Sequence, residues 1–184
     1  MKSIRLVKLA AAAAAAAMII ALPIASHAAD GTITFNGSIT AQTCTINGNG
    51  AGAKDFVVQL PKVSASSLAS AGQTAGRTPF NISLSACTPA SGTVHAFFEP
   101  GATTNASTGN LILTAGGATN VQIGLLNSDF TAIKAGYADA SQNSKAVTLT
   151  SGGATLSYFA EYVATGVATA GAANSTVMYT LAYQ

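Results

Sequence analysis

The sequence TVMYTLAY, residues 176–183, decides the fold, because apolar and polar side chains alternate along it without interruption. Val177, Tyr179, Leu181 and Tyr183 share one face, which is the period-two pattern of a β-strand with one buried side. The stretch reaches the penultimate residue of the chain. We therefore expect a strand at the C-terminus, with no further strand after it.

The stretch GTITFNGSITA, residues 31–41, alternates equally well near the other end of the chain. Such a pattern predicts a strand that buries one face, and its position at the start of the mature chain favours pairing with another chain. The face to be buried carries Gly31, Ile33, Phe35, Gly37, Ile39 and Ala41.

Residues 1–28 have the features of a signal peptide and are set aside from the fold. Three basic residues precede an alanine-rich apolar stretch, and Pro23 breaks that stretch. Ser26 and Ala28 are the small residues that lead to a cleavage site before Ala29, with a cut one residue later as the minor option. A membrane anchor is the alternative, since residues 9–29 are long enough to span a bilayer. The alanine content, Pro23 and the cleavage site favour export.

The charge of the mature chain argues against nucleic acid as a partner. Three of the eight Lys and Arg residues leave with the leader. Five basic residues and six Asp and Glu residues remain, so the net charge becomes −1. No basic stripe remains to neutralise phosphate groups.

The remaining pattern is all-β. Short runs of β-branched and aromatic residues are bounded by Gly, Asn, Ser or Pro, and only residues 64–71 could form a helical turn or two. Many short strands in a chain of this length predict a single antiparallel sandwich domain. The clearest runs are residues 32–40, 56–60, 80–85, 93–98, 110–113, 121–126, 146–150, 156–163 and 176–183.

The cysteines indicate a disulfide. An exported chain with two cysteines, Cys44 and Cys87, favours one bridge between them. In the chain-entropy model a loop of that length contributes about 4 kcal/mol of stabilisation. Two separate thiols or a metal pair are the alternatives, but a metal site would lack ligands because His95 is the only histidine outside the leader.

No catalytic constellation is apparent, and we expect neither an enzyme nor a cofactor. His95 lies in a strand-like run where it should face solvent or be lightly packed, and no nucleophile-elbow sequence accompanies it. Nothing pairs the two glutamates, Glu99 and Glu161, as glycosidase chemistry requires. The glycine-rich residues 48–53 precede a strand-like run instead of the helix that a dinucleotide site needs.

Several motifs at the two ends belong together. A short extension with a central glycine precedes Cys44, Gly171 is the fourteenth residue from the end, and Tyr183 is penultimate. With these features the chain resembles the pilin subunits of bacterial chaperone–usher fimbriae, in particular the type 1-like major subunits. The resemblance also covers QLPKV at 59–63, AGRTPFNISL at 75–84, YVATG at 162–166 and GAAN at 171–174.

The resemblance implies an incomplete immunoglobulin-like sandwich that lacks its last strand and is completed by a donor strand from a neighbouring subunit. It implies a signal peptide (1–28), an N-terminal donor-strand extension running into the first strand (29–43) and a pilin domain (44–184). The donor residues would be Gly31, Ile33, Phe35, Gly37 and Ile39. The groove that accepts a donor or chaperone strand would contain Gly171, Val177, Tyr179, Leu181 and Tyr183.

The partners implied are identical subunits in a filament, a periplasmic chaperone, an outer-membrane usher and an adaptor or tip adhesin. The subunit would be exported through the periplasm into a cell-surface fimbrium that supports cell adhesion. A tip adhesin is one alternative, but it would carry a second domain and no extension. A minor adaptor subunit is another, since it would share every motif named above.

Overall fold

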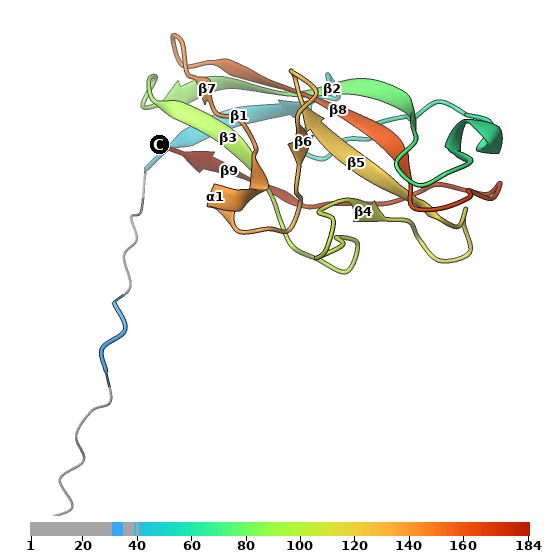
Figure 1. Ribbon diagram of the computed structural model, residues 1–184. Helices are drawn as coiled ribbons and strands as arrows, with labels where there is room; N and C mark the ends of the chain where they lie inside the picture. The colour runs from blue at the N-terminus through green and yellow to red at the C-terminus, as the bar shows by residue number, and fades with distance from the viewer. Residues whose placement is uncertain (1–30, 35–38, 40) are drawn as a thin grey trace, which may run out of the picture. The chain divides into compact units, whose positions relative to one another are not determined.

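The computed structural model describes residues 31–34, 39 and 41–184. The chain divides into two units, residues 1–38 and 39–184, and the strands lie in the second (Figure 1). The expected signal peptide, together with Phe35 and Gly37, lies outside the described residues. In chain order the elements are β1 (Thr43–Gly48), η1 (Ala65–Leu68), β2 (Thr74–Thr88), β3 (Thr93–Phe98), β4 (Leu111–Ile112), β5 (Val121–Asn127), β6 (Ala132–Ile133), α1 (Asp139–Gln142), β7 (Val147–Thr148), β8 (Ala154–Ala164) and β9 (Tyr179–Tyr183).

Two antiparallel sheets make up the described part of the second unit. The larger has the order β1-β2-β8-β5-β4, with β6 also paired to β5, and the smaller has the order β7-β3-β9. β2 and β8 form the spine of the larger sheet, because their alternating apolar residues pair over most of their length. Within residues 41–184, no helix is long and apolar enough to cross a membrane.

The core lies between the two sheets. Phe80 and Tyr158 from the larger sheet meet Phe98 from β3, with ring centroids 5.5 Å apart in both the Phe80–Tyr158 and the Phe98–Tyr158 pair. The Tyr158 hydroxyl also accepts a hydrogen bond from the Ala96 amide of β3 at 3.2 Å. The sheets therefore face each other as an all-β sandwich, as expected from the sequence.

The Cys44–Cys87 disulfide joins β1 to the end of β2. It lies where the N-terminal extension enters the domain, next to the pair formed by Thr43 and Thr88. The bridge therefore fixes the start of β1 to the body of the sandwich.

Two expectations about local structure were wrong. Residues 56–60 alternate like a strand, yet no neighbouring strand pairs with them and they join neither sheet. A one-turn helix, α1, forms in a segment whose sequence predicts irregular structure, and the buried Gln142 holds it against β3. Both outcomes depend on contacts that are remote in sequence.

Candidate functional site

One edge of the smaller sheet, β9, is unpaired among the described residues, and we call this strand together with the residues that lead into it, 173–178, the free edge. The even-numbered residues of this stretch turn their backbone groups toward β3 and the residues next to it. The Glu99 amide donates to the Met178 carbonyl oxygen at 2.9 Å, and the backbone groups of Thr93 and Gln184 exchange two hydrogen bonds. The same alternation of hydrogen-bonding direction continues before β9, where the Thr114 amide donates to the carbonyl oxygen of Asn174 at 2.8 Å.

The odd-numbered residues of the free edge turn their backbone groups the other way, because hydrogen-bonding direction alternates along a strand. The N–H and C=O groups of Val177, Tyr179, Leu181 and Tyr183 bond to no other residue that the structure describes. Unpaired backbone groups in a row form a template for an added strand.

The side chains of those same residues point toward the core but are only half-buried. Val177, Tyr179, Leu181 and Tyr183 all pack against the core cluster. Burial raises the pKa of the Tyr183 hydroxyl, and burial followed by the nearby Asp55 carboxylate raises the pKa of Tyr179. Both hydroxyls therefore stay protonated at neutral pH, and the floor below the free edge is apolar and uncharged.

A second stretch, residues 55–63, begins opposite Tyr179 of the free edge, and we call it the facing segment. Its side chains alternate in burial: Phe56, Val58 and Leu60 are half-buried against the core, whereas Val57 is 77% exposed. Among the described residues, no backbone hydrogen bond pairs residues 55–63 with a strand. We call the space between the free edge and the facing segment the groove.

Aromatic contacts connect the two walls of the groove. Phe56 lies 6.1 Å from both Phe80 and Tyr179, measured between ring centroids, and the Tyr179 hydroxyl donates to the Lys54 carbonyl oxygen at 2.8 Å. Gly48 makes room for Phe56, because a Cβ atom there would lie 1.9 Å from the ring. One tyrosine side chain thus reaches from the free edge to the residues on the other side of the groove.

The opposite edge of the same sheet is closed. β7 pairs with the first residues of β3, the Tyr158 hydroxyl accepts from Ala96, and the side-chain amide of Gln142 bonds both backbone groups of Phe98 at 2.6 and 2.9 Å. Gln142 is fully buried in this role. The β3 side of this sheet is therefore closed by β7 and by side chains. The edge along β9, which borders the groove, is the one available for a partner.

Gly171 begins the approach to the free edge, as its position in the C-terminal motif suggested. A Cβ atom at this residue would lie 2.5 Å from the Ala118 amide nitrogen. The neighbouring carbonyl of Ala172 accepts a hydrogen bond from Ala118 at 2.8 Å. Glycine is therefore required for the close contact that holds the start of the free edge.

The expected donor residues are described only in part. Ile33 and Ile39 are 79% and 103% exposed, and Gly31 is also exposed. Phe35 and Gly37 lie outside the described residues. The donor assignment therefore stays a prediction from the sequence.

The expectation for His95 was wrong. Its side chain is buried, and Nε2 bonds to Oδ1 of Asp139 at 2.7 Å. The contact became possible because α1 covers the outer face of β3, which the sequence pattern did not indicate.

Glu161, whose role the sequence left open, is also buried. Its Oε2 accepts from Nε of Arg77 at 2.7 Å, and the Arg77 guanidinium lies 4.6 Å above the ring of Phe130. Glu99 binds a different partner, Thr180, at 2.6 Å. These contacts give both carboxylates structural roles: Glu161 lies in β8 of the larger sheet, and Glu99 bonds to β9 of the smaller sheet.

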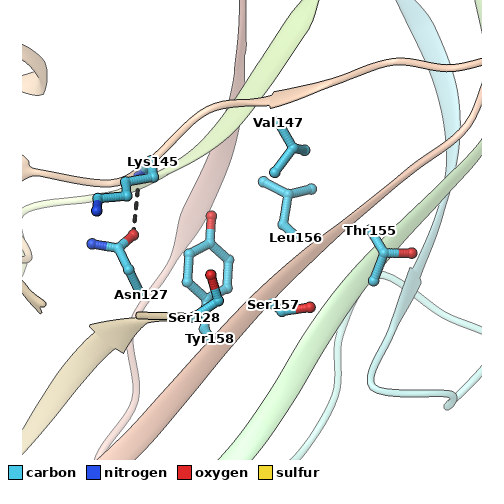
Figure 2. A pocket seen from close by; sticks show the side chains of 8 residues that line it. All are labelled: Asn127, Ser128, Lys145, Val147, Thr155, Leu156, Ser157 and Tyr158. Atoms are coloured by element: carbon cyan, nitrogen blue, oxygen red, sulfur yellow. Dashed lines mark hydrogen bonds between the residues drawn. The ribbon is translucent and has the colours of Figure 1, made fainter. Parts of the chain in front are cut away.

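A small pocket lies away from the groove, beside β5, β7 and β8 (Figure 2). It measures about 130 Å³ and is lined by eight residues, among them Asn127, Lys145 and Tyr158. Figure 2 shows the hydrogen bond from the Lys145 amide to Asn127, at 3.0 Å. None of the lining residues is a histidine, cysteine or carboxylate, so the pocket offers no acid–base pair or metal ligand set.

Comparisons with known proteins agree with this geometry. Residues 60–184 match the family described as type-1 fimbrial protein, A. The chain is 51% identical over 172 residues to the major fimbrial subunit SMF-1 of Stenotrophomonas maltophilia. The aligned region covers 90% of this chain and 99% of that protein. The chain is also 52% identical over 166 residues to the F17 fimbrial protein of Escherichia coli, covering 87% and 91%. A solved chaperone–usher pilus shares the fold with a TM-score of 0.59 and 24% identity, covering 85% of this chain and 96% of that one.

Proposed function

Because the chain belongs to the type-1 fimbrial protein family, as a structural shaft subunit of a chaperone–usher pilus, we propose that it polymerises by donor-strand exchange. Residues 31–41 of one copy fill the groove of the next. Ile33, Phe35 and Ile39 enter the core of the acceptor, and the donor backbone pairs with its free edge. This is strand addition to an exposed sheet edge.

The free edge is the observation that carries the proposal. It combines unpaired backbone groups with half-buried apolar side chains at Val177, Tyr179 and Leu181. An exposed edge of this kind promotes aggregation unless another strand covers it. The facing segment, whose apolar residues also lack a strand partner, supplies the second wall.

The lengths of the two stretches match. The alternating extension covers residues 31–41 and the free edge covers residues 173–183, so both have eleven residues. Burying Ile33, Phe35 and Ile39 stabilises the contact by roughly 1.5–3 kcal/mol each. With a ladder of backbone hydrogen bonds at about 1 kcal/mol apiece, the total is on the order of 10 kcal/mol before ordering costs.

The positions of the chain ends favour one direction for the donor strand. β1 starts and β9 ends at the same end of the sandwich, because Thr43 pairs with Thr88 and Thr93 pairs with Gln184. A donor parallel to β9 would bring two such ends together and block further growth. An antiparallel donor places its own body at the opposite end, which gives the open head-to-tail contact that a filament needs.

Before polymerisation the groove needs a temporary partner. A periplasmic chaperone that lends a strand to the free edge would prevent aggregation, and the outer-membrane usher is the place where the next subunit's extension replaces it. An adaptor or tip adhesin with the same kind of extension or groove would join the end of the shaft.

Deleting residues 29–36 tests the proposal. The variant should fold with the chaperone and keep its groove, but it should add no further subunit, because it has no donor strand. The matched control is Thr34→Ser, which changes the polar face of the extension only. Filaments formed by the deletion variant alone, seen by electron microscopy, would refute donor-strand exchange through residues 31–41.

A further inference from the structure

Two loops at one end of the sandwich are joined into a rigid surface, and we call residues 117–120 and 165–171 the loop platform. The Thr119 amide donates to Oγ1 of Thr169 at 2.9 Å, and the two hydroxyls lie 3.0 Å apart. The side-chain amide of Asn120 donates to the Val167 carbonyl at 2.9 Å, and the Thr165 amide donates to the Asn120 carbonyl at 2.9 Å. Loops are usually the mobile part of a domain, whereas hydrogen bonds between these two loops hold them together.

The surface of the loop platform is uncharged and partly apolar. Residues 117–120 and 165–171 contain no Lys, Arg, Asp or Glu. Val167 is 67% exposed. A surface without charges loses little on removal from water, so it suits contact with another protein surface.

The opposite end of the sandwich holds the base of the extension, and we call residues 42–43, 88–92 and 184 the exit end. The side-chain amide of Gln42 donates to the Pro89 carbonyl oxygen at 2.7 Å, and Thr43 pairs with Thr88. From Gln42 onward the chain is therefore fixed to its own body, with no flexible linker. The exit end also carries no charged side chain.

We propose that the loop platform of one copy is the docking surface for the exit end of the next copy. The inference rests on the proposed donor-strand exchange and adds a second contact to it. An eleven-residue donor opposite an eleven-residue free edge brings Ala41 beside Ala173 of the acceptor. Gln42 of the donor copy is already bonded to its own body, and one extended residue spans only about 3.4 Å.

The two bodies are consequently too close to be separated by solvent. Ala173 lies two residues from Gly171, which packs on Ala118 of the loop platform. The exit end of the donor copy therefore meets the platform directly. The contact, and not a linker, sets the angle between successive subunits, and the hydrogen bonds between the two platform loops keep that angle uniform along the filament.

Cysteine pairs in the full, filament-forming chain test the contact. Val167→Cys combined with Ala90→Cys, or with Ser91→Cys, should give covalent multimers that a reducing agent collapses to monomers. The matched control combines Val57→Cys with the same partners. Val57 is similarly exposed, but it follows Phe56, whose ring contacts Tyr179. Tyr179 lies about 20 Å along the edge from Ala173 at 3.4 Å per residue.

Val167→Glu gives a second measurement that does not need new cysteines. The variant should still form multimers by donor-strand exchange, but its filaments should bend more, with a persistence length in electron micrographs reduced at least twofold. Multimers that form normally, do not cross-link through Val167 and remain as straight as the unchanged protein would overturn the platform contact alone. Multimers that persist after deletion of residues 29–36 would instead overturn donor-strand exchange.

Discussion

The Tyr179 hydroxyl donates a hydrogen bond to the backbone carbonyl oxygen of Lys54 at 2.8 Å, from one wall of the groove to the other. Tyr179 belongs to the free edge and Lys54 directly precedes the facing segment, so the bond joins stretches 125 residues apart. It holds the walls at a defined separation while no donor strand lies between them. The groove is therefore preorganised by its own side chains.

Replacing this tyrosine measures the strength of the bond. Tyr179→Phe should lower the free energy of unfolding of the subunit without its extension by about 1 kcal/mol, since water can replace the partner at the exposed Lys54 carbonyl. Urea denaturation followed by circular dichroism gives the value. The control is Tyr183→Phe, because the Tyr183 hydroxyl bonds to no residue in the described ranges. Equal losses in both variants would contradict a role for the Lys54 bond.

Gly171 should not tolerate a side chain. Gly171→Ala places a methyl group 2.5 Å from the Ala118 nitrogen, and relieving this clash should cost about 1–3 kcal/mol. Thermal unfolding should show a lower Tm and a reduced yield of subunit. Gly101→Ala is the matched control, because no atom lies within 4 Å of the position that its methyl group would take, and its stability should change by no more than about 0.5 kcal/mol. Similar Tm values for the two variants would argue against the close contact.

The buried carboxylate of Glu161 depends on Arg77. Arg77→Met should destabilise the subunit by about 1–3 kcal/mol, because it leaves a charge without its partner in a side chain that is 6% exposed. The loss should stay below that for a fully buried pair, since Arg77 is 41% exposed. Adding Glu161→Gln to the same variant should recover part of the stability in denaturation experiments. No recovery would mean that Arg77 acts through its contact with Phe130 alone.

Asp129 should give the protein an acid-sensitive contact. The hydrogen bond from the Lys145 side chain, followed by that from Thr131, lowers the pKa of Asp129 to about 2. Because the folded pKa lies below the unfolded value of about 3.9, this stabilisation is present above pH 4 and is lost as the pH falls toward 2. An NMR titration of the Asp129 carboxyl carbon measures the value directly.

Lys145→Met should raise the pKa of Asp129, since it removes the largest cause of the shift. Lys134→Met is the control, because Lys134 lies over the Tyr137 ring and takes no part in the Asp129 contacts. The assignment fails if the Asp129 titration is the same in the Lys145 variant as in the unchanged protein.

Much of the fold was readable from local patterns. The alternation in residues 176–183 identified which side chains of β9 point inward, because side chains of a strand point to opposite faces in turn whatever lies beside it. The cysteine count in an exported chain indicated the Cys44–Cys87 bridge for a similarly general reason. The same alternation in residues 31–41 led to the prediction that they form the donor strand, and that prediction still rests on the sequence alone.

Other features depended on partners that are distant along the chain. Residues 56–60 alternate as clearly as many true strands, but strand pairing is a contact between remote segments, and here the neighbouring strand is missing. His95 was expected near solvent, yet α1 brings Asp139 over it from 44 residues away. Arg77 and Glu161 are 84 residues apart in sequence, and they meet because β2 pairs with β8.

The sequence by itself therefore determined which face of an alternating stretch would be apolar, because that follows from a two-residue period. Whether such a stretch becomes a strand depends on a pairing partner, as residues 56–60 show. Only the tertiary structure decided which edges are closed and which is open. Gln142, Tyr158 and β7 seal one side of β3, whereas nothing in the described residues pairs with the odd-numbered backbone groups of residues 173–183. That difference arises from long-range packing, and it gives the alternating C-terminal strand a groove in which to receive a partner.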